Sequence, residues 1–180
     1  MRPGLAMTVR AGRLFAYAWL TLFASLPSAG WSNPQEAQLK AAFIYRFAQF
    51  TEWPPPPLQE FHYCMVGEGP LASALQAISS KSQAGVPAVF RLIKSPSQAE
   101  ACQLLVLAAV DRLDWQRWMR ALKDEPVLLV GDSPDAFRAG AVFTLVLETN
   151  GLAFRVNNTE ARRRGLVLSS QVLKLAREVR

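Results

Sequence analysis

FHYCMVGEGPLASAL, residues 61–75, has the pattern of a strand, a turn and the start of a helix. The apolar run at 61–66 is typical of a buried strand, and Gly67 and Gly69 permit a tight turn after it. Pro70 suits the first turn of a helix, because its ring fixes a helical φ and its missing amide hydrogen has no intrahelical partner there. A strand that leads directly into a helix is the building unit of α/β folds.

The same alternation continues toward the C-terminus. Strands are expected at 87–93, 102–108 and 127–130, and an amphipathic helix is expected at 111–123. Two final strands flank Asn150-Gly151, a dipeptide that favours a hairpin turn. The sequence therefore predicts an α/β fold, namely a three-layer αβα single domain with a mostly parallel central sheet and a C-terminal antiparallel hairpin.

Residues 35–53 have the helical period, with Phe43, Phe47 and Phe50 at i, i+4 and i+7. Further apolar residues extend this surface over most of the helix circumference, which indicates either burial on two sides or use at an interface. We favour a core role for most of it. Trp53 and the prolines at 54–57 are expected to end the helix.

The first thirty residues have the pattern of a cleavable signal peptide, which we assign to 1–30. Three arginines precede an apolar stretch at 14–24 that is too short to span a membrane, and small residues follow at 28–30. We expect cleavage before Trp31, a mature domain at 31–180 and a location in the periplasm. A retained membrane anchor is the alternative.

The charge of the exported part is modest. Removal of the leader leaves 17 basic and 14 acidic residues, a net charge of +3. The excess is concentrated at 155–180, without a long basic stripe or interleaved aromatic residues. Nucleic-acid binding is therefore disfavoured.

Cys64 and Cys102 are the two cysteines of the chain. An even number of cysteines in an oxidising compartment indicates a disulfide between them. Two buried free thiols and a metal pair are the alternatives. A metal site has weak support, because His62 is the single histidine and further ligands would be needed.

Residues 67–72 match G-x-G-x-x-A, a variant of the fingerprint that binds a dinucleotide pyrophosphate. That site needs an acidic residue at the end of the second strand, where residues 86–93 offer only Arg91. An exported protein would also meet little soluble dinucleotide. We expect an ordinary strand-to-helix turn and no cofactor, although helix N-termini of this kind also attract anions.

The motifs of common enzymes are missing from the sequence. There is no G-x-S-x-G, and a lone histidine cannot serve both a triad and a metal. The aspartates that could form carboxylate pairs also occupy positions where caps and turns prefer this residue, and we favour that structural role. They are Asp111, Asp114, Asp132 and Asp135. We therefore expect a protein that is not an enzyme.

The C-terminal segment predicts two short helices. Asn158 or Thr159 is expected to cap the first, which runs to Arg164, and Ser169 or Ser170 is expected to cap the last helix. The last helix is expected to direct Val172, Leu173, Leu175 and Ala176 inward. Arg162-Arg163-Arg164 is interpreted as a solvated face, with ligand binding as the alternative.

Several segments together resemble the YfiR family over nearly the whole mature domain. The resemblance covers 40–54 (KAAFIYRFAQFTEWP), 63–71, the strand that follows Cys102, 126–132, and 154–179 (FRVNNTEARRRGLVLSSQVLKLAREV). The helix that ends in Trp-Pro and the pattern of the C-terminal segment are its most specific parts.

The resemblance implies a periplasmic regulator that binds and represses an inner-membrane diguanylate cyclase or a similar signalling protein, which lowers cyclic-di-GMP and biofilm formation. It implies a homodimer, an outer-membrane-anchored protein that sequesters the regulator, and a disulfide between Cys64 and Cys102. Well-known members carry a second cysteine pair near the late hairpin. This chain lacks that pair, so redox control through it is not transferred.

We expect repression by binding alone, with Phe43, Phe47 and Phe50 at the partner interface. If a small ligand binds, its polar contacts are expected from Asn157, Arg162, Ser169 and Ser170, which cluster around two helix N-termini; a purely structural role as caps and turn residues is the alternative. A periplasmic sensor or carrier of small ligands is the second functional hypothesis.

Overall fold

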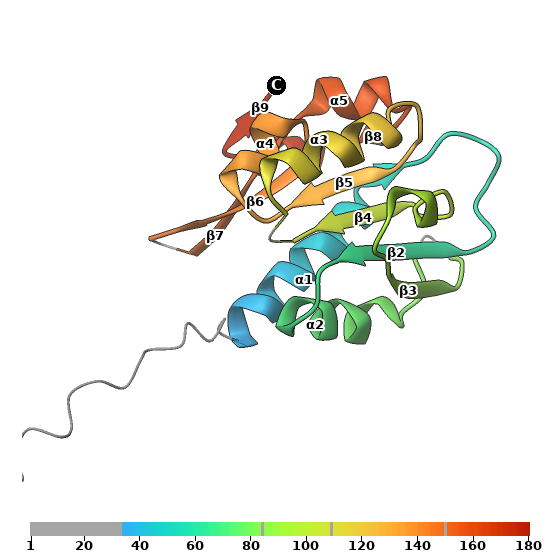
Figure 1. The fold of residues 1–180 in the computed structure, drawn as a ribbon, viewed down its shortest axis with the longest axis horizontal. Helices are drawn as coiled ribbons and strands as arrows, with labels where there is room; N and C mark the ends of the chain where they lie inside the picture. The colour runs from blue at the N-terminus through green and yellow to red at the C-terminus, as the bar shows by residue number, and fades with distance from the viewer. Residues whose placement is uncertain (1–33, 84, 109, 150) are drawn as a thin grey trace, which may run out of the picture. The chain divides into compact units, whose positions relative to one another are not determined.

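The computed structural model describes residues 34–83, 85–108, 110–149 and 151–180. The expected leader at 1–30 and its cleavage site before Trp31 lie outside these residues. Within them, strands and helices alternate along the chain, as the pattern of residues 61–75 indicates (Figure 1).

A seven-stranded sheet lies at the centre of the described part, in the order β3–β2–β4–β5–β6–β7–β9 (Figure 1). Its strands are β2 (Phe61–Val66), β3 (Ala88–Leu92), β4 (Leu104–Leu107), β5 (Leu128–Gly131), β6 (Phe143–Glu148), β7 (Gly151–Val156) and β9 (Glu178–Val179). The strands from β3 to β6 run parallel, and β7 runs antiparallel to β6. The mostly parallel sheet and the C-terminal antiparallel hairpin are therefore confirmed.

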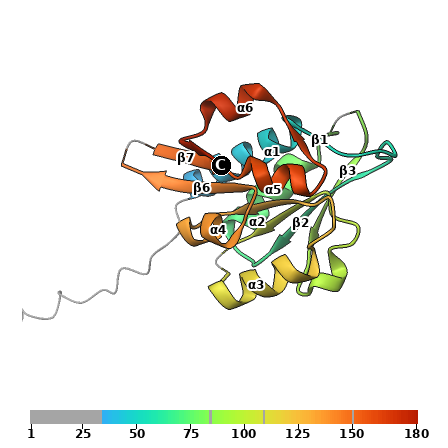
Figure 2. The ribbon, with the colours of Figure 1, turned by 90° about the horizontal axis from the view of Figure 1, so that it is seen from above.

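Helices cover both faces of this sheet. They are α1 (Pro34–Gln49), α2 (Pro70–Ser79), α3 (Arg112–Ala121), α4 (Pro134–Ala139), α5 (Asn158–Arg163) and α6 (Ser170–Leu175), with a short 3₁₀ turn at Pro96–Gln98. One apolar cluster joins α1, α2 and α6 to one face, and a second cluster joins α3 and α4 to the other. Figure 2 shows α3 and α4 opposite α1 and α6. The predicted three layers are confirmed.

Helix α1 ends earlier than the sequence pattern predicts. Its last residue is Gln49, and Thr51–Glu52 forms β1, which pairs antiparallel with β8 (Val167–Leu168). The Thr51 hydroxyl also donates to the Phe47 carbonyl oxygen over 2.7 Å. Pairing with a distant part of the chain therefore ends the helix before the prolines are reached.

The disulfide between Cys64 and Cys102 is present and joins neighbouring strands. Cys64 lies in β2, and Cys102 precedes β4, which pairs with β2 along their length. The two Cα atoms are 5.8 Å apart, and both residues are buried beneath the α3 layer. The predicted pairing is confirmed, and the covalent link holds the centre of the parallel sheet.

Candidate functional site

An apolar groove of about 320 Å³ runs along α1. Helix α1 forms one wall, and β7 and α6 contribute the rest. Its lining residues are Leu39, Ala42, Phe43, Arg46, Phe47, Phe50, Phe154, Val172 and Leu175. The α1 members, at positions 39, 42, 43, 46 and 47, are related by spacings of three and four, so they form one stripe along the helix over about two turns.

Phe47 forms the floor of the groove. Its ring stacks on that of Phe143 with the centroids 4.0 Å apart, and only 1% of Phe47 is exposed. The ring of Phe154 lies 5.0 Å away from it. Phe47 was predicted as an interface residue, but the stack makes it a core residue that supports the groove from below.

Phe43 and Phe50 are partly buried and form the walls. The rim is more exposed: Leu39 is 44% exposed and Leu175 is 71% exposed. Leu175 was expected to point inward, and this expectation is wrong. It is the last residue of α6, because Ala176 already has extended backbone angles, so its side chain lies beyond the last packed turn.

Arg46 is the one charged residue of the lining. Its guanidinium donates to the Gln49 side chain over 2.8 Å, and within the described ranges no carboxylate pairs with it. The groove therefore offers an apolar surface with a single cation at its edge. Such a surface suits apolar contact with another molecule and lacks the convergent polar groups of an enzyme active site.

The predicted ligand residues serve local structure and do not line this groove. The Asn157 side chain accepts the Glu160 amide over 3.0 Å and so caps α5, one residue earlier than expected. The Ser169 hydroxyl accepts the Gln171 amide over 3.2 Å and caps α6, as predicted. Arg162 and Ser170 are exposed. Ligand binding by these four residues stays a prediction.

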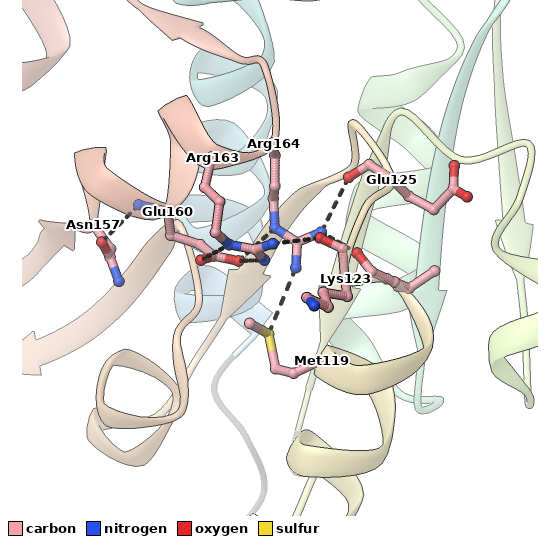
Figure 3. A network of polar contacts seen from close by, with 8 residues as sticks. Met119, Lys123, Glu125, Asn157, Glu160, Arg163 and Arg164 are labelled. Carbon is pink, nitrogen blue, oxygen red and sulfur yellow. Dashed lines mark hydrogen bonds and ion pairs between the residues drawn. The ribbon is translucent and has the colours of Figure 1, made fainter.

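Arg163 and Arg164 anchor α5 to the end of α3 (Figure 3). The Arg164 side chain is fully buried and donates to Glu160 Oε1 over 2.8 Å and to the Leu122 carbonyl over 2.7 Å. Arg163 donates to the Lys123 carbonyl over 2.6 Å and also binds Glu160. The Leu122 carbonyl belongs to the C-cap of α3 and the Lys123 carbonyl follows it, at the end of a helix that attracts positive charge. The expected solvated face is therefore limited to Arg162 and the exposed part of Arg163, whereas Arg164 is buried. The spacing of Glu160 from these arginines was the signal that could have revealed the anchor.

The charges in this network shift one another's pKa values. Burial alone would raise the pKa of the Glu160 carboxyl, but the hydrogen bonds from Arg163 and the charge of Arg164 lower it below its ordinary value. Burial lowers the pKa of Arg164, against the opposing effect of Glu160. The network is thus an ionised structural cluster that fixes α5, rather than an acid–base pair in a cleft.

The turn at Gly67 and Gly69 lies where the sheet order reverses, between β2 and β4. Both glycines have a positive φ, and a Cβ on Gly67 would come within 3.2 Å of the Ala108 carbonyl oxygen. Ligands of open α/β sheets commonly bind at such a reversal. Here the backbone conformation and the close approach to β4 explain the glycines without a ligand.

The aspartates have structural partners. The Asp111 side chain accepts the amides of Leu113 and Asp114 over 2.8 and 2.9 Å, which confirms its role as a helix cap. Asp114 and Asp135 pair with arginines one turn later in their own helices. Within the described residues, no group of three or more His, Cys, Asp or Glu side chains is placed to hold a metal ion. No helix there is both long and apolar enough to cross a membrane.

Two solved structures share this fold. A conserved domain protein from Vibrio cholerae O1 biovar El Tor str. N16961 matches with 12% sequence identity and a TM-score of 0.55, over 80% of this chain and 60% of that chain. An ABC domain in complex with L-Trp from Streptococcus pneumoniae matches with 10% identity and a TM-score of 0.53, over 81% of this chain and 60% of that chain. This chain therefore spans 60% of the length of each. At these identities the likeness concerns the fold alone.

A family model described as YfiR/HmsC-like (DUF4154) matches residues 37–177. The match begins in α1, includes both cysteines and the Arg163–Arg164 anchor, and ends just before β9. The chain therefore belongs to the YfiR/HmsC-like family.

Proposed function

We propose that this protein is a periplasmic repressor that binds the periplasmic part of an inner-membrane diguanylate cyclase and holds it inactive. Repression would lower cyclic-di-GMP and biofilm formation. The YfiR/HmsC-like family consists of periplasmic, regulatory, non-catalytic proteins of diguanylate cyclase signalling, and membership supports the proposal.

The apolar groove along α1 is the observation that supports the proposed repressor function. Leu39 and Leu175 expose apolar side chains in the same lining as the partly buried rings of Phe43 and Phe50. Exposed apolar side chains gathered around a groove mark a protein-binding surface more often than a solvated one. Arg46 at the edge favours an apolar segment of the partner that carries an acidic residue.

In this proposal, competition for the groove releases the repressor from the cyclase. An outer-membrane-anchored protein that offers an apolar segment to the same groove would displace the cyclase and sequester the repressor. Both interactions then share one surface, so a substitution that closes the groove to one partner weakens binding of the other.

A periplasmic sensor or carrier of small ligands is the second candidate, because a volume of about 320 Å³ is at the lower end of ligand pockets. Such sites usually combine an apolar lining with several convergent polar groups. Arg46 is the single charged group of this lining, which favours a protein segment over a polar metabolite.

The deciding experiment replaces Leu175 with glutamate in the full-length chain. Leu175 is 71% exposed, so the substitution leaves the core intact while it places a charge on the rim. We expect Leu175→Glu to lose co-purification with the membrane cyclase and to raise cellular cyclic-di-GMP to the level of a deletion strain.

Leu113→Glu is the matched control, because Leu113 is 76% exposed on α3, on the opposite face of the sheet. It should repress like the wild type. The repressor function is wrong if the wild-type protein binds no membrane cyclase and its deletion leaves cyclic-di-GMP unchanged. If the deletion raises cyclic-di-GMP but Leu175→Glu still represses, the function holds and the groove is not the partner surface.

A further inference from the structure

Two adjoining hollows lie between α3 and α4, which cover the face of the sheet opposite α1 (Figure 2). One has a volume of about 380 Å³ and the other of about 370 Å³, and Gln116 and Ala139 line both. The two hollows therefore form one groove, which we call the α3–α4 groove. Its charged lining residues are Arg112, Arg120, Lys123, Asp135 and Arg138.

The α3–α4 groove follows the whole length of α3. Arg112 is the first residue of this helix, and Lys123 lies two residues beyond its end. A helix of 10 residues is about 15 Å long, at a rise of about 1.5 Å per residue. Between the two ends, Met119 packs against the C-terminal end of α4, where a Cβ built on Gly140 would lie 2.9 Å from the Met119 Cε. The middle of the groove therefore offers an apolar, adaptable side chain.

Positive charge dominates this groove. Its lining holds four basic side chains and one carboxylate, a net charge of +3, and that carboxylate, Asp135, is already paired with Arg138 of the same helix. In the part of the chain that the structure describes, no carboxylate pairs with the side chains of Arg112, Arg120 or Lys123. Residues 31–180 together carry a net charge of only +3. The groove therefore concentrates positive charge on one face, which attracts a negatively charged ligand.

The spread and exposure of these cations favour a chain with several carboxylates over a single small anion. Arg138 exposes 75% of its side chain, and Arg112, Arg120 and Lys123 are exposed as well. Holding such long side chains around one small anion costs rotamer entropy, and a single exposed ion pair contributes little. The described lining also contains no aromatic side chain on which a nucleic-acid base would stack. An extended peptide advances about 3.3–3.6 Å per residue, so about five residues span the groove and contact several of the cations at once.

We propose that the α3–α4 groove binds an extended acidic segment of a partner protein, whose carboxylates pair with Arg112, Arg120 and Lys123. An arginine guanidinium accommodates a carboxylate with two parallel hydrogen bonds, which is how arginine clusters recognise acidic motifs. Gln116 lies one helical turn from both Arg112 and Arg120, so its side-chain amide is available to the peptide backbone between the two carboxylates. The apolar groove along α1 lies on the other face of the sheet, so the protein can hold both partners at once. The proposal is independent of the repressor function.

The test is fluorescence anisotropy with a labelled hexaglutamate peptide at low ionic strength, on protein purified from the periplasm after expression of the full-length chain. Wild type should bind hexaglutamate saturably and hexaglutamine not at all, and added salt should weaken the binding. Arg112→Ala/Arg120→Ala should raise the dissociation constant about tenfold, because two exposed ion pairs are lost. Arg91→Ala/Lys94→Ala is the matched control: it removes the same charge from exposed positions in and just after β3 and should bind within about twofold of wild type.

The results separate the alternatives. Absence of saturable binding to hexaglutamate overturns the proposal, and so does an equal loss in both double variants, which would show general attraction by net charge. If glutarate displaces hexaglutamate at the same carboxylate concentration, the groove binds small anions and the peptide occupant is wrong. If phosphatidylglycerol vesicles bind wild type through the same two arginines while hexaglutamate does not, the groove faces a lipid surface instead. Arg112→Ala/Arg120→Ala should still co-purify with the membrane cyclase, so failure of this proposal is distinct from failure of the repressor function.

Discussion

Arg164 donates its Nε–H to the Glu160 carboxylate over 2.8 Å from a side chain with no exposed surface. The same guanidinium reaches the Leu122 carbonyl over 2.7 Å, so one buried ion pair on α5 also fixes the end of α3. The C-terminal segment, which carries the groove residues Val172 and Leu175, follows directly from this anchor.

Arg164→Ala should lower the free energy of unfolding by about 3–5 kcal/mol, because it leaves the Glu160 carboxylate and the α3 carbonyls without their buried donor. Arg162→Ala is the control, since Arg162 is exposed beside it and should change stability by less than about 0.5 kcal/mol. Urea denaturation measures both. Equal stability of the two variants would contradict the anchoring role.

Acid should weaken this anchor. The pKa of Glu160 is lower in the folded protein than its ordinary value of 4.5, so the unfolded chain binds a proton more readily there. The stabilisation is complete above pH 4.5 and is lost as the pH falls through the folded pKa. Urea denaturation from pH 7 to pH 3 should show Glu160→Gln less stable than wild type at pH 7, with the difference shrinking in acid. A difference that stays constant would contradict this linkage.

Reduction of the Cys64–Cys102 disulfide should destabilise the fold by up to about 4 kcal/mol, the chain-entropy value for a closed loop spanning a separation of 38 positions. Urea midpoints with and without a reducing agent measure the effect. The double variant Cys64→Ala/Cys102→Ala should be less stable and insensitive to the reducing agent. An unchanged midpoint of the reduced wild type would show that the disulfide adds no stability.

Phe47→Ala should cost about 3–5 kcal/mol, because the ring is buried and stacks on Phe143. Phe50→Ala should cost less, since Phe50 is only partly buried at the groove wall. Thermal unfolding compares the two. The partner surface is therefore better tested at Leu39 or Leu175, where a substitution does not disturb the core.

The sequence predicted those features that depend on local pattern. The apolar runs indicated the buried strands, and Pro70 indicated the start of α2. The presence of two cysteines in an exported chain indicated the Cys64–Cys102 disulfide. Features that depend on distant contacts were missed. Thr51 pairs with Leu168, and Arg164 binds the Leu122 carbonyl beyond the end of α3. The two partners of each contact are far apart in the sequence, so a local sequence pattern cannot indicate them. The groove was only half predicted: the α1 stripe is periodic, but the exposure of Leu175 depends on where α6 stops.

A side chain at Gly131 should destabilise the protein, and this tests the close packing of α4 on the end of β5. A Cβ built there would lie 2.2 Å from the Ala136 Cβ and 2.8 Å from the Trp115 ring, and both neighbours are buried. Gly131→Ala should therefore cost about 1–3 kcal/mol by overpacking. Removing the Ala136 Cβ should relieve this overpacking. The double variant Gly131→Ala/Ala136→Gly should therefore be more stable than the sum of the two single changes predicts. Ala139→Gly is the control that measures the cost of a glycine in α4 alone. Strict additivity in urea denaturation would show that the two residues do not meet.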